Sequence, residues 1–228
     1  LVHHYYMNTI KEVILSAGSI NSPQILMLSG IGPKEELEKF QIPVIQNLKV
    51  GENMQDHVAL GGLTFVIDEP ISLRLERVSG IRTVMNYAAM GDGPLTVLGG
   101  VEGLAFVNTK YANKSEDFPD IEFHFVSGST NSDASQLSKV HGLTHEFYNR
   151  TFGPITAEDT WSVIPMLLRP RSRGVVKLKS KNPFHYPLIY ANYFQDNHDM
   201  KVLVEGVKIA MALSKTRPFR KLKSYFNG

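Results

Sequence analysis

The sequence contains no cysteine, which excludes a disulfide scaffold, thiolate metal sites and cysteine nucleophiles together. An excess of either charge is also missing, since 24 Lys and Arg against 22 Asp and Glu give no reason to expect nucleic acid as a partner. No apolar run is long enough to predict a transmembrane segment, and the first residues lack a signal-peptide pattern. The phosphate loop G-x-x-x-x-G-K-[ST] and the nucleophile motif G-x-S-x-G are absent as well, so neither an NTPase nor a hydrolase is supported.

The composition that remains is that of a folded protein. With 228 residues and 43% hydrophobic content, the chain can bury one large or two small domains. Its first residues lack an initiator Met and lead directly into an expected core strand, so we expect an internal piece of a longer protein. Two N-glycosylation sequons, at Asn113 and Asn149, lie in polar stretches and favour a secreted, extracellular protein.

The first 57 residues predict alternating strand and helix. An unbroken apolar run within residues 12–16 predicts a strand covered on both faces, as in a parallel sheet. Ser22 followed by proline predicts a helix start, with the helix continuing to Leu28. A second short helix is predicted from Pro33 to Phe40.

From residue 58 onward the pattern changes to that of an antiparallel sheet with helices. Alternating or apolar runs predict strands at 63–67, 102–108, 121–126, 161–168 and 175–179. Helices are predicted around 78–88 and 203–211, the second opened by Asp196 or Asn197 as its cap. The polar, aperiodic stretch 127–152 predicts a long surface loop or an insertion. The expected fold class is therefore mixed, α/β before about residue 57 and α+β after it.

One corner of this pattern is typical of nucleotide binding. A strand that ends in Ala17-Gly18 lets the backbone approach a dinucleotide, and the following helix directs N–H groups and a positive dipole end toward its phosphates. Such corners also occur throughout α/β proteins as plain packing devices, so the pattern alone leaves both interpretations open.

Three longer stretches resemble one enzyme family. Residues 18–32, GSINSPQILMLSGIG, resemble a signature of the glucose-methanol-choline (GMC) flavoprotein oxidoreductases. Residues 47–57 look like that family's N-x-x-V-G-x-N-x-Q-D-H peptide. Ser172-Arg173-Gly174 and Asn192-Tyr193-Phe194 are similar to its C-terminal region, whose start would lie at about residue 160. The phrases at Gly93 and Glu102 resemble insect glucose-dehydrogenase-like members.

The resemblance implies an FAD-dependent enzyme that oxidises the CH–OH group of an alcohol or sugar by hydride transfer to the flavin. Residues 1–57 would end an FAD-binding, Rossmann-like domain, and residues 58–228 would form an incomplete substrate domain with an antiparallel sheet. The positions expected beside FAD or at the crossing between the domains are Ala17, Gly18, Ser22, Asp56 and His57. His57 could instead be an ordinary hydrogen-bonded residue of the joint.

The sequence departs from a complete family member at both ends. The family's opening G-x-G-x-x-G fingerprint is absent, and its catalytic histidine lies in a C-terminal segment that this chain does not reach. We therefore assign no catalytic residue and expect the 228 residues alone to be inactive. His141 and His145 have metal-ligand spacing but no third ligand, so no metal is expected.

Two questions stay open at the level of sequence. The family uses one sheet face as the floor of its substrate pocket, and Phe123, Phe125, Trp161 and Met166 either contribute to that floor or pack in the core. The alternative to an enzyme is a non-catalytic binding module that derives from the substrate domain. Neither the oligomeric state nor the substrate can be predicted.

Overall fold

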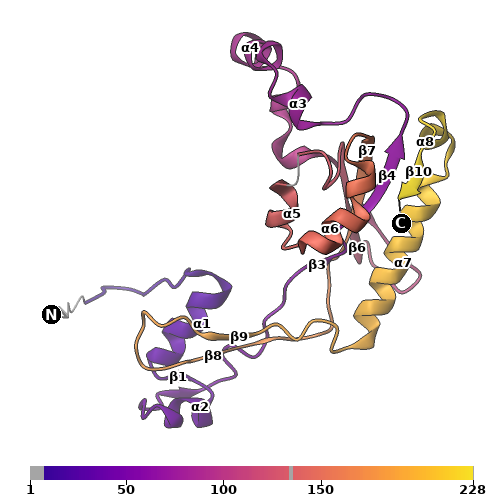
Figure 1. Ribbon diagram of the computed structural model, residues 1–228. Helices are drawn as coiled ribbons and strands as arrows, with labels where there is room; N and C mark the ends of the chain where they lie inside the picture. Colours follow the sequence, from indigo (N-terminus) through magenta and orange to yellow (C-terminus); the bar gives the residue numbers. More distant parts are fainter. Residues whose placement is uncertain (1–7, 134–135, 228) are drawn as a thin grey trace. The chain divides into compact units, whose positions relative to one another are not determined.

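The computed structural model describes residues 8–133 and 136–227, and the chain divides into two compact units (Figure 1). The first unit contains Leu1–Asp56 and Ser172–Gln195, and the second contains His57–Arg171 and Asp196–Gly228. A boundary at residue 57 was expected, whereas the return of residues 172–195 to the first unit was not. None of the described helices is both long and apolar enough to cross a membrane.

The first unit is a small α/β structure with two pairs of strands. Its elements are α1 (Gly18–Leu28), β1 (Ile31–Gly32), α2 (Lys34–Lys39), β2 (Gln46–Asn47), β8 (Val175–Lys177) and β9 (Leu188–Tyr190). Strand β1 pairs parallel with β2, and β8 pairs antiparallel with β9. The core is formed by Met27, Leu37, Ile42 and Leu178, so the segment around β8 shares one core with the N-terminal helices. The second predicted helix is confirmed as α2.

Two predictions for the start of the chain are wrong. Residues 12–16 form no strand, and Val13 and Ile14 are each 79% exposed. A buried strand needs neighbours on both edges, and the described strands of this unit pair with one another instead. Helix α1 begins at Gly18 rather than after Ser22, with Pro23 inside it. Pro23 is the sixth residue of α1, where it lacks the amide that would bond to the Ser19 carbonyl, and the helix continues past it to Leu28.

The second unit is built on one antiparallel sheet. Its strands follow the order β10-β4-β7-β6-β5, with β3 also paired to β7. They are β3 (Val58–Ala59), β4 (Leu63–Ile67), β5 (Val101–Val107), β6 (Ile121–Val126), β7 (Asp159–Leu167) and β10 (Tyr225–Asn227). The predicted strands at 63–67, 102–108, 121–126 and 161–168 are confirmed as β4, β5, β6 and β7, and the prediction at 175–179 as β8.

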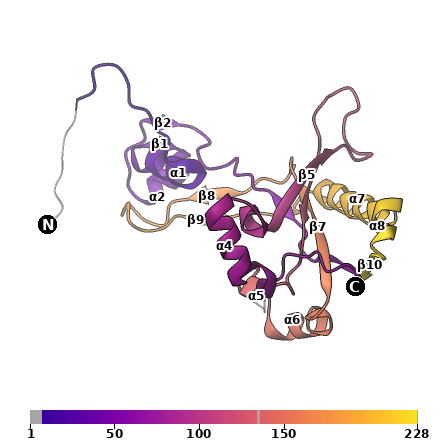
Figure 2. The same cartoon turned by 90° about the horizontal axis from the view of Figure 1, so that it is seen from above.

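Different helices cover the two faces of this sheet. On one face lie α7 (Asn197–Ser214) and α8 (Arg217–Lys221): a Cβ at Gly206 of α7 would stand 3.1 Å from Ile121 Cδ1, and Phe219 of α8 stacks on Trp161. On the other face, α6 (His145–Thr151) and η3 (Gly153–Ile155) pack on Val66 of β4. Figure 2 shows α7 and α8 on one side of β7 and α5 (Gln136–Val140) on the other.

The stretch 127–152 is not the surface loop that its polarity predicted. It contains α5 and α6, and its residues 129–132 are buried. Asn131 Nδ2 donates to the carbonyl oxygens of Ile155 and Glu158, and Thr160 Oγ1 donates to Asn131 Oδ1. Polar side chains can therefore be interior here because neighbouring backbone and hydroxyl groups satisfy their hydrogen bonds.

Two further helices match their predictions. Helix α4 (Ile81–Met90) follows the short α3 (Leu75–Val78) and ends at Gly91, which has a left-handed φ of 65°. Helix α7 is capped by Asp196, whose side chain accepts a hydrogen bond from the His198 amide. The short helices η1 (Pro94–Thr96) and η2 (Leu98–Gly100) link α4 to β5. The predicted fold class, a mixed α/β structure with an antiparallel sheet, is confirmed.

Candidate functional site

The corner that opens α1 has the features expected of an anion-accepting helix start. The Ala17 amide donates to Ser22 Oγ at 3.0 Å, so this hydroxyl holds the turn before the helix closed. Gly18 has φ +89°, a conformation that glycine adopts at little cost, and a Cβ there would meet nothing within 4 Å. The first turn of α1 carries no acidic side chain. Its free amides and positive dipole end are therefore available to a phosphate group.

A cavity of about 480 Å³ lies against the same helix, within the first unit. It extends from Ala17 along α1 to the loop that joins β8 and β9, and Phe184 and Tyr186 of that loop are more than 80% exposed. Gln24 of α1 is buried, and its Nε2 donates to the His185 carbonyl at 2.9 Å. This side chain thus ties the hairpin loop to the helix that carries the corner.

A second cluster joins the stretches that the sequence matched separately. Tyr193 Oη donates to Asp56 Oδ2 at 2.6 Å, and this bond with the nearby carboxylate raises the pKa of Tyr193 above its usual value. Arg173 Nε donates to Asn53 Oδ1 at 2.9 Å, and Asn192 Nδ2 donates to the Arg173 carbonyl at 3.1 Å. The N-x-x-V-G-x-N-x-Q-D-H peptide, the S-R-G segment and the N-Y-F segment therefore form one network.

Close backbone packing supports this cluster. Met54 and Gly174 form an isolated antiparallel bridge, and their amides and carbonyls exchange two hydrogen bonds of 3.1 and 2.8 Å. Gly51 has φ +83°, and a Cβ there would stand 2.3 Å from the Val176 carbonyl oxygen. Only glycine fits at this position, because any side chain would collide with the backbone of β8.

The structure thus separates the predicted cofactor positions into two groups. Ala17, Gly18 and Ser22 come together at the start of α1, while Asp56 belongs to the cluster with Tyr193. His57 is exposed and is the first residue of the second unit. Sequence reasoning named Tyr193 only as part of a motif. Its contact with Asp56 spans 137 positions, a separation that no local pattern reveals.

In the second unit, the sheet face away from α7 has exposed side chains at its β5 edge. Two cross-strand rows follow from the register, and the side chains of each row point to the side away from α7: Leu104, His124 and Ile164 in one row, and Phe106, Glu122 and Met166 in the other. Leu104 and Phe106 are 55% and 57% exposed, and His124 Nε2 lies 3.0 Å from Glu122 Oε1. The rows form a mostly apolar platform with one polar pair at its centre.

The four aromatic and methionine candidates fall on opposite faces. Phe123, Phe125 and Trp161 share the face that α7 and α8 cover, because β6 and β7 pair Phe123 with Pro165 and Phe125 with Val163. Met166 is on the opposite face. The packing interpretation therefore holds for the buried Phe123, and Met166 alone of the four belongs to the platform.

Comparison with known families decides what these pieces belong to. Residues 3–59 match the N-terminal model described as GMC oxidoreductase, and residues 170–227 match the C-terminal model of the same description. The chain belongs to the GMC oxidoreductase family. The resemblance seen in the sequence is confirmed, and both matched regions contain residues described above: the α1 corner in the first, and Arg173 and Tyr193 in the second.

Relatives of this GMC chain are named as dehydrogenases and oxidases. A glucose dehydrogenase [FAD, quinone] of Drosophila pseudoobscura pseudoobscura is 35% identical over 213 residues, which are 92% of this chain and 31% of the relative. An ecdysone oxidase of Spodoptera littoralis is 34% identical over 216 residues, again 92% of this chain and 34% of the relative. The chain thus spans about a third of the curated relatives it matches. None of these names supports a non-catalytic module.

Solved structures agree with the family. A formate oxidase from Aspergillus oryzae RIB40, studied for FAD modification, superposes with a TM-score of 0.69 at 26% identity and covers 93% of this chain and 38% of its own. A fungal aryl-alcohol oxidase superposes with a TM-score of 0.62 at 20% identity, covers 92% of this chain and 39% of its own, and shows the fold alone. The expectation of FAD thus agrees with the cofactor named for the glucose dehydrogenase and the formate oxidase.

Proposed function

We propose that this GMC chain is part of an FAD-dependent oxidoreductase that acts on the CH–OH group of an alcohol or sugar. The observation that carries the proposal is the Ala17–Gly18–Ser22 corner, which lies within the family match and leaves the start of α1 open. The relatives named as glucose dehydrogenase, choline dehydrogenase and ecdysone oxidase support the class of reaction.

The residues of the corner suit FAD. Open space at Gly18 lets the backbone approach the dinucleotide, Ser22 fixes the turn, and the amides of α1 face a phosphate without a competing carboxylate. When bound, FAD supplies the redox chemistry by accepting hydride from the alcohol carbon. In this proposal the bond between Asp56 and Tyr193 fixes the end of the first unit, and His57 begins the second unit.

The platform on the sheet is the part that we propose faces the substrate. Its exposed Leu104 and Phe106 would contact the apolar part of a substrate, while the Glu122 and His124 pair would orient substrate hydroxyl groups by hydrogen bonds. This placement uses Met166 of the four candidate residues and leaves Phe123, Phe125 and Trp161 to the opposite face.

The test compares variants of two serines, Ser22 within α1 and Ser29 at its C-cap, in the protein expressed from its complete reading frame. Ser22→Ala should weaken FAD retention about tenfold, a change of the size expected when a turn-holding hydroxyl is lost. Ser29→Ala removes only a hydroxyl that donates to the Ile25 carbonyl and should leave retention unchanged. Flavin absorbance of the purified proteins after dialysis measures both.

Two results would contradict the proposal. Equal retention in Ser22→Ala and the unmodified protein would remove the corner from the FAD site, and equal loss in both serine variants would indicate a general effect on α1. The 228 residues alone should not take up FAD stoichiometrically, which a flavin titration with absorbance readout checks. Tight uptake by the chain alone would contradict that part.

A further inference from the structure

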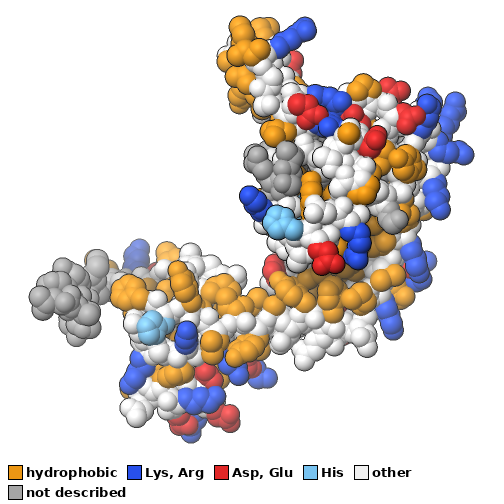
Figure 3. Space-filling view, viewed as in Figure 1, with side chains coloured by type: hydrophobic (Ala, Val, Ile, Leu, Met, Phe, Trp, Pro, Cys, Tyr) orange, Lys and Arg blue, Asp and Glu red, His pale blue; other side chains and the backbone are white. Residues whose placement is uncertain are grey.

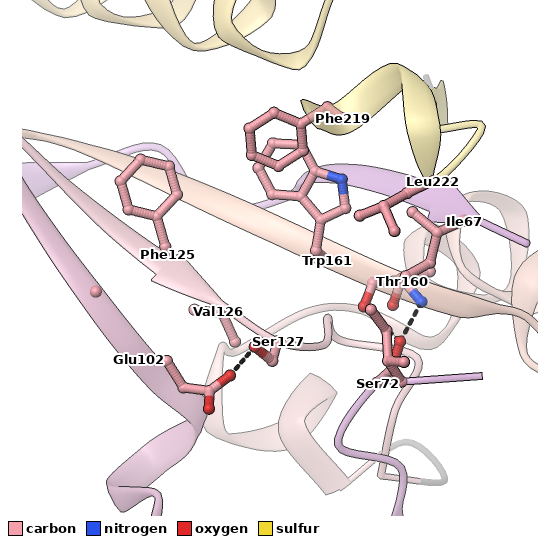
Figure 4. Close-up of a pocket in the computed structure, with 12 residues that line it drawn as sticks. Ile67, Ser72, Glu102, Phe125, Val126, Ser127, Thr160, Trp161, Phe219 and Leu222 are labelled. Carbon is pink, nitrogen blue, oxygen red and sulfur yellow. Dashed lines mark hydrogen bonds between the residues drawn. The ribbon is translucent and has the colours of Figure 1, made fainter. Parts of the chain in front are cut away.

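A cavity of about 370 Å³ lies in the second unit on the side of the sheet that carries α7 and α8 (Figure 4). Its wall includes Trp161, the chain's single tryptophan, whose ring stacks between Phe65 and Phe219 with ring centroids 4.5 and 4.2 Å away. Phe125 projects from β6 on the same side of the sheet. The cavity is therefore on the opposite face from the platform of Leu104 and its neighbours, and the proposed function does not use it.

The cavity has an apolar body and polar groups at two places, Glu102 with Ser127 and Ser72 with Thr160. Ile67, Leu222 and the three aromatic rings form the body. At the first of these places, Ser127 Oγ donates a hydrogen bond to Glu102 Oε2. The other hydroxyls are already used: Ser72 Oγ donates to the Thr160 carbonyl at 2.7 Å and accepts from the Thr160 amide at 2.7 Å.

Glu102 is thus the polar group of the cavity that can accept further hydrogen bonds. A carboxylate can accept about four hydrogen bonds, and the bond from Ser127 is the one found for it among the described residues. Within that part of the chain no lysine, arginine or histidine forms a salt bridge with Glu102. A negative acceptor beside an apolar, aromatic wall favours a ligand that brings a positive donor on an apolar body.

We propose that this cavity binds a small amphipathic organic cation, a primary amine on an alkyl or arylalkyl chain. The ammonium group donates to Glu102, and the apolar chain lies along Phe125 and the Trp161–Phe219 stack. The volume is at the lower end of the range for small-molecule sites, which suits a short chain rather than a drug-sized or nucleotide ligand.

Trp161 provides a direct readout, because no other tryptophan contributes to emission. Three probes of equal chain length distinguish the ligand classes: n-octylammonium, n-octanol and n-octanoate. We expect n-octylammonium to shift the Trp161 emission to shorter wavelength in a saturable titration, because the alkyl chain displaces water from the cavity wall. Octanol should bind about fivefold more weakly and octanoate more weakly still, since only the cation pairs with Glu102.

Two variants distinguish the effect of the Glu102 charge from the effect of the cavity volume. Glu102→Gln should weaken n-octylammonium binding about fivefold and leave octanol unchanged, while Glu146→Gln on exposed α6 is the matched control. Gly103→Val should abolish binding of both probes by filling the cavity. A Cβ at Gly103 meets nothing closer than Phe125 Cδ2 at 3.6 Å, so the fold should be retained, as circular dichroism would show.

Three results from the probes and the Gly103→Val variant would each overturn the proposal. They are no saturable change in Trp161 emission, an octanoate affinity equal to that of n-octylammonium, or binding that persists in a folded Gly103→Val variant. Equal weakening by Glu102→Gln and Glu146→Gln would also overturn it, because the effect would then come from overall charge and not from the cavity.

Discussion

Asp159 links two segments of the second unit through a partly buried ion pair. It binds the Arg77 guanidinium through both carboxylate oxygens, one of them at 2.9 Å, and Oδ1 also accepts from the Ser72 amide at 2.9 Å. The Asp159 side chain is 13% exposed and the Arg77 side chain 36%. The hydrogen bond from Arg77 is the main reason that the pKa of Asp159 is held below its ordinary value of 3.8.

We predict that Asp159→Asn lowers the free energy of unfolding at pH 7 by about 1–2 kcal/mol, at the low end for a charged hydrogen bond because solvent partly screens Arg77. The lowered pKa also sets a pH dependence. The unfolded chain binds this proton more readily than the native state, so the stabilisation is complete above the ordinary pKa of 3.8 and is lost as the pH falls through the lowered native pKa. The variant should lack this component.

Urea unfolding between pH 7 and pH 3, followed by Trp161 emission, measures both effects. The matched control is Asp68→Asn, which removes an exposed carboxylate paired with the exposed Lys223 at 2.8 Å. The control should unfold like the unmodified protein, because solvent screens exposed pairs. If Asp159→Asn lost as much unfolding free energy at acid pH as the unmodified protein does, the ion pair with Arg77 would contribute nothing to stability.

At the scale of elements, helix α4 carries several large apolar side chains that are exposed to solvent. Ile81 and Met90 are each 76% exposed and Met85 is 64% exposed, and Figure 3 shows hydrophobic side chains gathered over this helix. Large exposed apolar groups raise the tendency of a protein to adhere to other surfaces, and they add little to its own core. Their replacement should therefore alter adhesion far more than stability.

We predict that the double change Met85→Lys and Met90→Lys alters the free energy of unfolding by less than about 0.5 kcal/mol and clearly reduces retention on a hydrophobic-interaction column. Ala88→Lys with Ala89→Lys adds the same charge on the same exposed helix without removing a large apolar group. If both double variants lost retention equally, the added charge would explain the effect and the apolar side chains of α4 would not.

Helices and strands could be predicted where the residues that determine them are close together in the sequence. Alternation predicts β6, and the aspartate before α7 predicts its cap. Residues 12–16 were predicted wrongly, because a strand depends on partners elsewhere in the chain. The buried turn around Asn131 was missed for a related reason: its acceptors, such as the Ile155 carbonyl 24 residues away, are invisible to a polarity pattern.

The candidate site divides in the same way. Ala17 and Ser22 are five residues apart, so a spacing argument could place them together at the start of α1, although not the extra helical turn between them. The cluster of Asp56 with Tyr193 and of Asn53 with Arg173 joins positions more than a hundred residues apart. Motif resemblance could name these residues, but only the fold shows that they are partners.

At the scale of the whole molecule, each unit has a hydrophobic core of its own. Leu37 is fully buried in the first unit among Met27, Ile42 and Leu178. Leu167 is 2% exposed in the second unit, where it lies opposite Ile121 in the sheet. Because a unit with its own core can lose its structure without the other, the two need not unfold in one step.

We therefore predict two separable unfolding transitions in urea. Trp161 emission reports the second unit alone, whereas far-ultraviolet circular dichroism reports both. Leu167→Ala should destabilise the second unit by about 2–5 kcal/mol and shift the emission midpoint, because it leaves a cavity in the sheet core. Leu37→Ala should cost the first unit a similar amount and shift only part of the circular dichroism signal. If Leu37→Ala moved the Trp161 emission midpoint as far as Leu167→Ala does, the two units would unfold as one. Leu37 lies in the first unit, whereas Trp161 reports the second.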